Sequence, residues 1–189
     1  MSIFKRFYPN LYTRTTYNID FIKLFDHGFR GIIFDIDNTL VPHDAPADIK
    51  ATMLFRKLQA MGFQTMIVSN NKEPRVKSFA DVVGSGYVFL ADKPGTKGYL
   101  EVVDRMGLRK EQVIVIGDQF FTDIWGANRS GLRSVMVGRI SSKEPPHIHL
   151  KRMLELPIKK AYFKTRRKSG KVGETAWDDM RVEEYRFRL

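Results

Sequence analysis

The chain has 189 residues, a formal net charge of +11 and no cysteine. This length suits one domain with a substantial core, and the lack of cysteine excludes disulfides, thiolate catalysis and cysteine-ligated zinc. No apolar run approaches the ~20 residues that a transmembrane helix requires, and the N-terminus lacks the sustained apolar stretch of a secretory signal. We therefore expect a cytoplasmic protein, or one that associates peripherally with the inner face of a membrane.

The positive charge is concentrated near the two ends of the chain. Basic residues outnumber acidic residues by 5 to 2 in residues 1–30, by 13 to 12 in 31–138 and by 11 to 2 in 139–171, whereas acidic residues prevail by 5 to 3 in 172–189. This distribution, together with the motifs of the central region, predicts an aromatic and basic N-terminal segment (1–30), a central domain (31–140) and a basic C-terminal extension (141–189).

The N-terminal segment combines eight aromatic side chains with basic residues. Within it, residues 19–25 have the spacing of a short amphipathic helix that would end near Gly28. Aromatic rings beside basic side chains suit a membrane interface or a partner surface. They equally suit packing over the edge of the central domain, and the sequence leaves these alternatives open.

In the central domain, short apolar runs alternate with helical patterns. The runs predict buried strands at residues 31–34, 63–69, 87–90, 113–116 and 134–137. The patterns between them predict helices at residues 48–61, 74–83, 96–106 and 122–130. This alternation predicts an α/β fold: a Rossmann-like three-layer sandwich with a parallel sheet of about five strands.

The end of the first predicted strand carries a pair of carboxylates, in the stretch GIIFDIDNTLV. Asp35 and Asp37 are two residues apart, so in an extended chain their side chains point to the same side. Like charges this close repel one another unless a cation lies between them. A hard divalent ion such as Mg²⁺ would fit such oxygen ligands, although a solvated Asx-rich turn is the structural alternative.

Polar and charged side chains also follow later strands of the predicted sheet: Ser69, Lys93, Asp118 and Asp123. The carboxyl ends of parallel strands line the ligand crevice of such a fold. A hydroxyl, an ammonium and several carboxylates can supply the nucleophile, the proton donor, the metal ligands and the phosphate-binding groups of phosphoryl transfer. Considered singly, each of these residues would also suit a helix cap, a surface lysine or a helix-start acid.

Across residues 31–140 the sequence resembles the haloacid dehalogenase-like phosphohydrolases. The four motifs of that family appear in order, each at the end of a predicted strand, as FDIDNTLV, VSNN, DKPG and GDQFFTD. The resemblance implies that Asp35 is the nucleophile that forms an aspartyl-phosphate. It implies that Asp37 first protonates the leaving oxygen and then activates water, which indicates a phosphatase because family ATPases usually have threonine at that position.

The resemblance also assigns the remaining site residues. Ser69, Asn70 and Lys93 would bind the transferring phosphoryl group. Mg²⁺ would be held by Asp35, Asp118 and the backbone carbonyl of Asp37. Asp123 would orient Lys93 or support the metal ligands, and Thr39 would have a supporting contact.

The spacing of the motifs leaves no room for an inserted cap domain, which many family members carry. About thirty residues separate Asp37 from Ser69, and about two dozen separate Ser69 from Lys93. In this respect the chain is similar to the capless type III A branch, which includes phosphatases of phosphatidylglycerophosphate. An open crevice suits a large substrate, so the resemblance implies a lipid phosphate.

The C-terminal extension admits three interpretations. Its basic residues would attract an anionic membrane, at about 1 kcal/mol for each residue near the surface. They would also attract RNA, with a strong dependence on salt. Pro145, Pro146 and Pro157 favour instead a partly disordered, solvated tail, whereas the apolar residues of 174–189 suggest that this last segment docks on the domain.

The sequence therefore predicts a Mg²⁺-dependent phosphomonoester phosphatase that acts on a phosphorylated, lipid-embedded substrate, with peripheral contact to an anionic membrane. Two alternatives stay open. One is a nucleic-acid- or ribosome-associated protein with a phosphatase-like domain, and the other is a phosphatase of another phosphorylated macromolecule or a small metabolite. The sequence does not determine the oligomeric state.

Overall fold

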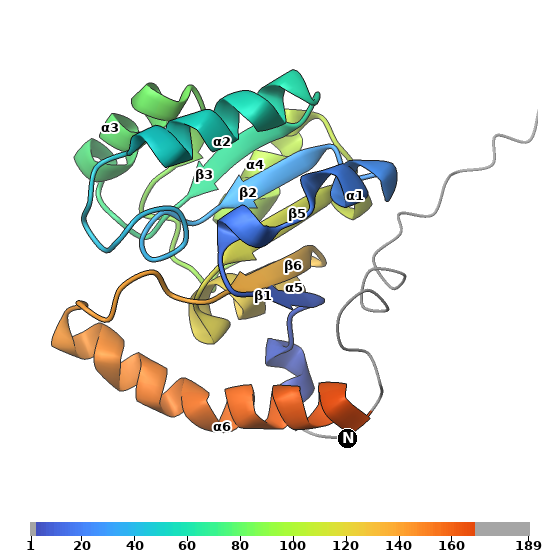
Figure 1. Cartoon of the computed structure of the whole chain (residues 1–189), viewed down its shortest axis with the longest axis vertical. Helices are drawn as coiled ribbons and strands as arrows, with labels where there is room; N and C mark the ends of the chain where they lie inside the picture. The colour runs from blue at the N-terminus through green and yellow to red at the C-terminus, as the bar shows by residue number, and fades with distance from the viewer. Residues whose placement is uncertain (1–2, 169–189) are drawn as a thin grey trace, which may run out of the picture.

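The computed structural model describes residues 3–168, and the expected docking of residues 174–189 lies outside this range. Six strands form one parallel sheet in the order β1-β6-β5-β2-β3-β4 (Figure 1). Their bounds are β1 (Leu11–Thr13), β2 (Gly31–Phe34), β3 (Gln64–Val68), β4 (Gly86–Val88), β5 (Val113–Gly117) and β6 (Arg133–Val137).

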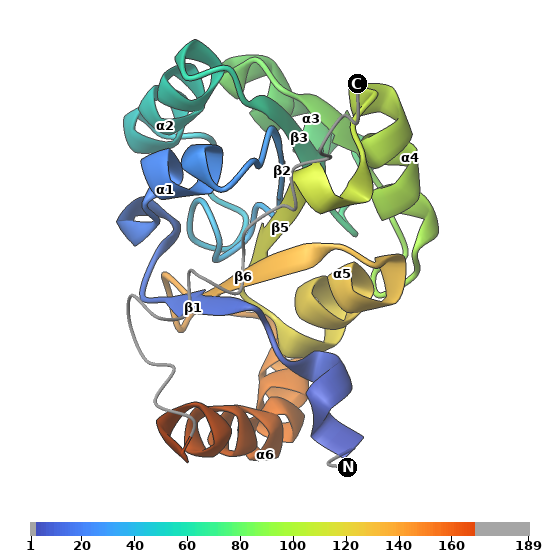
Figure 2. The same ribbon diagram turned by 90° about the vertical axis from the view of Figure 1, so that its right-hand side faces the viewer.

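Helices cover both faces of the sheet, as the alternating sequence pattern predicts (Figure 2). The helices of the structure are α1 (Phe21–Asp26), α2 (Ile49–Ala60), α3 (Glu73–Val83), α4 (Lys97–Met106), α5 (Trp125–Ser130) and α6 (Pro146–Lys168), the last of which lies beyond β1 at the edge of the sheet (Figures 1 and 2). Side chains of β2 alternate between two cores. Ile32 and Phe34 pack with α1, α2 and α3, whereas Ile33 packs with α4 and α5. The three-layer α/β prediction is confirmed.

The sheet has one strand more than the sequence predicted. β1 comes from the N-terminal segment and pairs in parallel with β6, where Leu11 lies opposite Val135. A strand of three residues at a sheet edge is too short to show the alternation of apolar and polar residues that identifies longer strands. The position of β1 is fixed by Asn10, which exchanges hydrogen bonds with the backbone of Ser134 at 2.9 and 3.0 Å.

The aromatic side chains near the N-terminus pack on the domain. Phe4, Phe7, Tyr8 and Tyr12 lie against a small core that contains Phe120 and other buried side chains. Of the alternatives that the sequence left open for these four rings, packing over the domain edge therefore describes the structure.

Residues 146–168 of the C-terminal extension form helix α6, although two prolines lie within this range. Pro146 begins α6, where its missing N–H costs nothing, and Pro157 lies inside the helix. One side of α6 packs against the core through Ile158 and Tyr162, which are 2% and 3% exposed. Burial of this side explains why the segment folds although its prolines favour a disordered tail. No helix within residues 3–168 is long and apolar enough to cross a membrane.

Glu155 is a buried acid on the inner side of α6, and it accepts a hydrogen bond from the backbone N–H of Phe121 at 2.9 Å. Burial raises its pKa from 4.5 to about 7, although the Phe121 N–H and Arg152 oppose this. The folded protein therefore holds this proton more tightly than the unfolded chain. As the pH rises from about 4.5 to about 7, Glu155 should lower the free energy of unfolding by an amount on the order of 3 kcal/mol.

Replacing Glu155 with Gln keeps a hydrogen-bond acceptor and removes the charge. We expect E155Q to match the wild type near pH 4 and to exceed its free energy of unfolding at pH 8, as measured by urea denaturation. The exposed acid Asp81 supplies a matched control, because D81N leaves the buried carboxyl of Glu155 in place and should not reproduce the gain in stability at pH 8. If the free energies of unfolding of E155Q and the wild type depended on pH in the same way, Glu155 would not be the source of the loss of stability.

Candidate active site

The strand-end residues surround one open cavity of about 350 Å³. Its lining includes Asp35 and Asp37 after β2, Ser69 and Asn70 after β3, and Lys93 after β4. The carboxyl ends of these parallel strands lie at one edge of the sheet, which brings together side chains far apart in sequence. The first turns of α6 also contribute His147, Ile148 and Lys151 to the lining. The sequence did not predict this contribution.

Lys93 bridges two carboxylates at the base of the cavity. Its Nζ donates to Asp35 Oδ1 at 2.6 Å and to Asp123 Oδ1 at 2.7 Å. Burial disfavours the charged ammonium, but Asp123 and Asp35 outweigh it and raise the pKa of Lys93 well above its usual value. Lys93 is therefore a fixed positive charge beside Asp35.

Asp35 combines burial with neighbouring negative charge. Burial raises its pKa to about 8, Lys93 opposes this rise, and the carboxylates of Asp123 and Asp118 add to it. A cation placed among these groups would lower that pKa, because it favours the ionised form.

Asp118 lies deeper, with a fully buried side chain. Burial raises its pKa to about 7, and Arg152 opposes the rise. The Oδ1 atom of Asp118 accepts a long hydrogen bond of 3.4 Å from the hydroxyl of Thr39. Its Oδ2 atom pairs with the guanidinium of Arg152, which also donates to the Asp118 backbone carbonyl at 2.9 Å.

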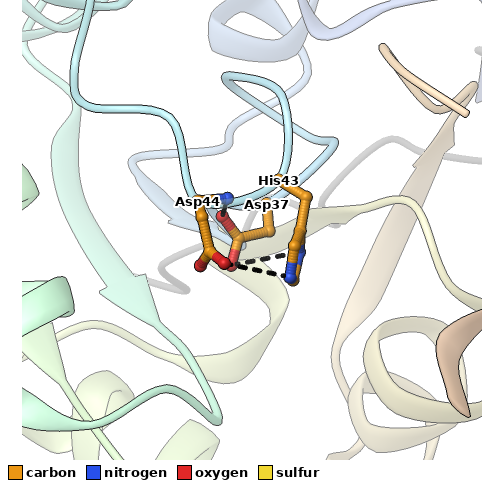
Figure 3. A group of neighbouring side chains, drawn as sticks. All are labelled: Asp37, His43 and Asp44. Atoms are coloured by element: carbon orange, nitrogen blue, oxygen red, sulfur yellow. Dashed lines mark hydrogen bonds and ion pairs between the residues drawn. The ribbon is translucent and has the colours of Figure 1, made fainter. Parts of the chain in front are cut away.

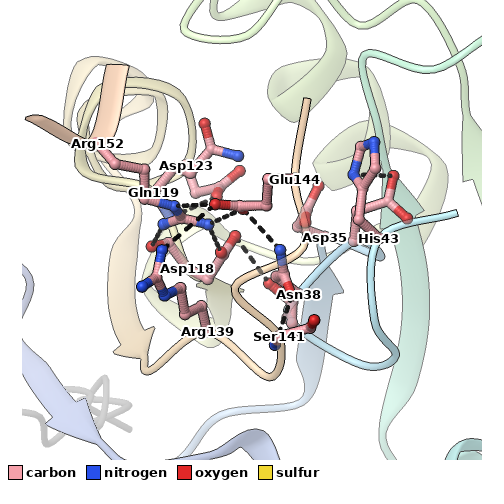
Figure 4. A network of polar contacts seen from close by, with 12 residues as sticks. Asp35, Asn38, His43, Asp118, Gln119, Asp123, Arg139, Ser141, Glu144 and Arg152 are labelled. Carbon is pink, nitrogen blue, oxygen red and sulfur yellow. Dashed lines mark hydrogen bonds and ion pairs between the residues drawn. The ribbon is translucent and has the colours of Figure 1, made fainter. Parts of the chain in front are cut away.

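Arg152 belongs to a polar network that joins α6 to the site (Figure 4). Besides Asp118, its guanidinium contacts both carboxylate oxygens of Glu144, at 2.6 and 3.0 Å. Glu144 accepts a further hydrogen bond from the side-chain amide of Asn38 at 2.6 Å, and the oxygen of that amide accepts one from the Ser141 N–H at 2.9 Å. The chain after β6 is thereby fastened to the loop that carries the two aspartates of the first motif.

Asp37 also lines the cavity, and its hydrogen-bond partners differ from those of Asp35 and Asp118. Its Oδ1 accepts hydrogen bonds from Arg75 at 2.9 Å and from the backbone N–H of Asp44 at 3.0 Å. Its Oδ2 accepts one from the side chain of Asn71 at 2.6 Å and lies 3.8 Å from His43 Nδ1. Figure 3 shows Asp37 with His43 and Asp44 gathered on the loop after β2.

Ser69 and Asn70 shape the backbone around the cavity. Asn70 Oδ1 accepts a hydrogen bond from the Lys93 N–H at 2.7 Å, and Asn70 Nδ2 donates to the Lys93 carbonyl at 3.1 Å. Ser69 is buried, and its hydroxyl accepts a hydrogen bond from the Asn71 N–H at 3.2 Å. The Asn70 side chain, expected to bind phosphate, thus holds the loop that presents Lys93.

Three carboxylates lie close enough together to share one divalent cation. One oxygen from each of Asp35, Asp118 and Asp123 lies within 4.8 Å of the others. Carboxylate oxygens are the hard ligands that Mg²⁺ prefers, and the raised pKa values of Asp35 and Asp118 reflect burial and negative charge that a cation would offset. The residues therefore fit a divalent metal. The carboxylate of Asp37 belongs to a separate group with His43 and Asp44.

Sequence reasoning missed Arg152 and Glu144. They lie eight residues apart in the basic extension, beyond the last motif, and no local pattern links them to Asp118. One weak indication was present in the sequence. Residues 139–171 contain eleven basic residues and only two acidic ones, Glu144 and Glu155. Arg75 was missed as well, because a basic residue near the start of a helix has no distinctive spacing.

Comparisons with known proteins indicate the class of protein to which the chain belongs. A family model described as haloacid dehalogenase-like hydrolase matches residues 43–131, a range that starts after Asp35 and Asp37. The protein named "Probable phosphatase YqeG" of Bacillus subtilis (strain 168) is 38% identical over 141 residues, which cover 74% of this chain and 82% of that protein. The protein named "Phosphatidylglycerophosphate phosphatase 1, chloroplastic" of Chlamydomonas reinhardtii is 30% identical over 158 residues, which cover 78% of this chain and 59% of that protein.

A solved structure shows the same fold. The cobalt-bound deoxy-D-mannose-octulosonate 8-phosphate phosphatase (YrbI) from Haemophilus influenzae superposes with a TM-score of 0.50 at 14% identity, over 75% of this chain and 92% of that chain. At this identity the likeness concerns the fold alone.

The chain belongs to the haloacid dehalogenase-like hydrolases, as the four motifs predicted. It is a phosphomonoester hydrolase, so its substrate carries a phosphate group. Phosphatases of this family generally use a divalent metal, and the acidic cluster of Asp35, Asp118 and Asp123 agrees with that requirement.

The Arg152 network yields a prediction about stability. The side chains of Asp118 and Glu144 are 0% and 1% exposed, so removing the guanidinium would leave two buried carboxylates without their main partner. We expect R152Q to lower the free energy of unfolding in metal-free buffer by roughly 3 kcal/mol, as measured by urea denaturation.

Two comparisons test this prediction. R139Q removes a half-exposed arginine that lies 3.7 Å from Glu144, and it should cost much less. Adding E144Q to R152Q should restore part of the lost stability, because one of the two uncompensated charges is removed. Equal effects of R152Q and R139Q would show that the buried network contributes little.

Proposed function

We propose that the protein is a Mg²⁺-dependent phosphatase that acts through an aspartyl-phosphate on Asp35, with a lipid phosphate such as phosphatidylglycerophosphate as substrate. The observation that carries the proposal is the position of Lys93. Its ammonium contacts Asp35 and Asp123 at 2.6 and 2.7 Å at the base of an open cavity. This arrangement supports nucleophilic attack by a carboxylate on an anionic group, because the ammonium offsets the negative charges that would otherwise repel each other.

In the first chemical step, a carboxylate oxygen of Asp35 attacks the phosphorus atom. A bond forms between that oxygen and phosphorus, while the bond from phosphorus to the ester oxygen of the substrate breaks. Asp37 gives its proton to the departing oxygen and so releases an alcohol. In the second step, Asp37 takes a proton from water, the resulting hydroxide attacks phosphorus, and Asp35 is regenerated with release of inorganic phosphate.

The surrounding residues hold this geometry. Lys93 fixes Asp35 and offers its charge to the phosphoryl oxygens, while Asp123 fixes Lys93 from the other side. Ser69 and Asn70 shape the phosphate-binding loop. A bound Mg²⁺, held by Asp35, Asp118 and the backbone carbonyl of Asp37, would neutralise the charge of the phosphate oxygens. Thr39 has a supporting role through its contact with Asp118.

Two observations support a large, lipid-embedded substrate. The chain from β2 to β3 contains α2 as its only helix, and the chain from β3 to β4 contains only α3, so within residues 3–168 no inserted domain covers the cavity. In addition, the Chlamydomonas reinhardtii relative and a second relative from Arabidopsis thaliana are both named as phosphatidylglycerophosphate phosphatases.

The nucleophile is tested by D35N, whose amide has nearly the same shape but is a poor nucleophile. We expect phosphate release to fall by about a thousandfold or more, while the circular dichroism spectrum is unchanged. D44N removes a largely exposed carboxylate at the cavity rim and should retain most of the activity. Activity of D35N above a few per cent of the wild type would refute the assignment.

The metal is tested by chelation. Treatment with EDTA should abolish phosphate release, and added Mg²⁺ should restore it. Ca²⁺ should not restore it, because its larger and looser coordination suits the in-line geometry poorly. Binding of Mg²⁺ to D118A, followed by calorimetry, should be much weaker than to the wild type. Full turnover in EDTA would overturn the metal requirement.

The substrate is tested by a phosphate-release screen over phosphatidylglycerophosphate, nucleotides, sugar phosphates and phosphopeptides. We expect the highest kcat/KM on the lipid in mixed micelles. A clear preference for one of the soluble compounds would replace the lipid assignment and leave the chemical mechanism intact.

A further inference from the structure

Helix α6 has an outer side that is apolar although no described part of the protein covers it. Leu150, Met153 and Leu154 are 60%, 65% and 60% exposed, and Pro157 is exposed beside them. These residues have the i, i+3, i+4, i+7 spacing of one helix face. We call these four residues the outer face of α6. The face does not serve the helix's own packing, because Glu155, Ile158 and Tyr162 anchor the inner side.

The exposed charges that accompany the outer face are positive. Lys151, Lys159, Lys160 and Lys164 are exposed on α6. The sole acid among residues 146–168 is Glu155, which is buried on the inner side. An apolar strip on a helix that exposes four lysines and whose only acid is buried is complementary to a surface that is both apolar and anionic.

The outer face begins at the same end of α6 that borders the active-site cavity, although it lies on a different side of the helix. His147, Ile148 and Lys151 line the cavity, and Leu150 directly precedes Lys151 in the same helical turn. The helix lies along the edge of the molecule beyond β1 (Figure 1). A flat surface resting on the outer face would therefore lie close to the beginning of α6, where the helix borders the cavity.

We propose that the outer face of α6 docks on an anionic lipid bilayer, with Leu150, Met153 and Leu154 entering the boundary between headgroups and acyl chains. The lysines of α6 then contact lipid phosphates, and Lys151 receives the headgroup at the mouth of the cavity. This docking deepens the lipid-phosphatase function proposed above and rests on it only for the identity of the substrate.

A bilayer explains these features better than the alternatives do. A second copy would bring the same lysines against each other, which disfavours self-association through this face. RNA would satisfy the lysines but would leave the leucines and the methionine exposed to water. The lipid bilayer accommodates both the apolar and the basic side chains.

The test compares two triple variants of the full chain, both with D35N so that no lipid is consumed. The first is L150S/M153S/L154S. The matched control is I49S/M53S/V82S, which replaces side chains on α2 and α3 that are 80%, 65% and 57% exposed. Vesicles of phosphatidylcholine with phosphatidylglycerol, and vesicles of phosphatidylcholine alone, are assayed by flotation.

The D35N parent, whose outer face is unchanged, should bind the anionic vesicles and should be released from them as the salt concentration rises. The outer-face variant should bind about tenfold or more weakly, and the control should bind as the parent does. Replacing Met153 with Trp should give a blue-shifted fluorescence on vesicles that brominated lipids quench, whereas M53W should give neither effect. Equal binding by both triple variants, or no vesicle binding by the parent, would overturn the proposal.

Two further measurements test whether something other than a bilayer covers the outer face of α6. If the outer-face variant abolished a dimer seen by sedimentation, a second copy would be the partner and the proposal would fail. If that variant lost stability to urea, protein atoms would cover the face and the proposal would fail equally.

With Asp35 intact, the outer-face variant should lose hydrolysis of vesicle-embedded phosphatidylglycerophosphate and keep hydrolysis of p-nitrophenyl phosphate. Loss of both activities by the outer-face variant would overturn the docking role. Absence of both in the wild type would instead refute the phosphatase mechanism, because vesicle binding is measured separately.

Discussion

The active site depends on stabilising several carboxylates that lie close together and are shielded from water. Asp35, Asp118 and Asp123 bring carboxylate oxygens within 4.8 Å of one another, and two of these side chains are almost wholly buried. Such a cluster is unfavourable unless cations accompany it. Lys93 supplies one permanent cation from the loop after β4. Because Asn70 holds the backbone of Lys93 through two hydrogen bonds, the loops after β3 and β4 together determine where that charge lies.

A second cation reaches the cluster from outside the motif-bearing domain. Arg152 contacts Asp118 and Glu144 from α6, so the C-terminal extension completes the electrostatic environment of the site. The same helix lines the cavity with Lys151 and presents leucine and methionine side chains on its outer face. Helix α6 therefore links the interior of the site to the molecular surface.

The elements that the sequence predicted well are those with strong local periodicity. β2 and β5 are continuous apolar runs, and α2 and α4 carry apolar side chains at helical spacing, so their short-range pattern was sufficient. β1 was missed because three edge residues have no pattern. Helix α6 was not predicted, because its formation depends on burying Ile158 and Tyr162 against distant residues, which outweighs the local effect of Pro157.

The sequence by itself determined the fold class, the family and the convergence of the strand-end residues, because a parallel sheet places the carboxyl ends of its strands at one edge. It also determined that Asp35 would have acidic neighbours and a lysine nearby. Only the tertiary structure decided that Arg152 pairs with Asp118, that Asn70 supports Lys93, and that no part of residues 3–168 covers the apolar outer face of α6. These features join residues far apart in the chain. Their geometry follows from how the helices pack on the sheet, and no local periodicity or spacing encodes it.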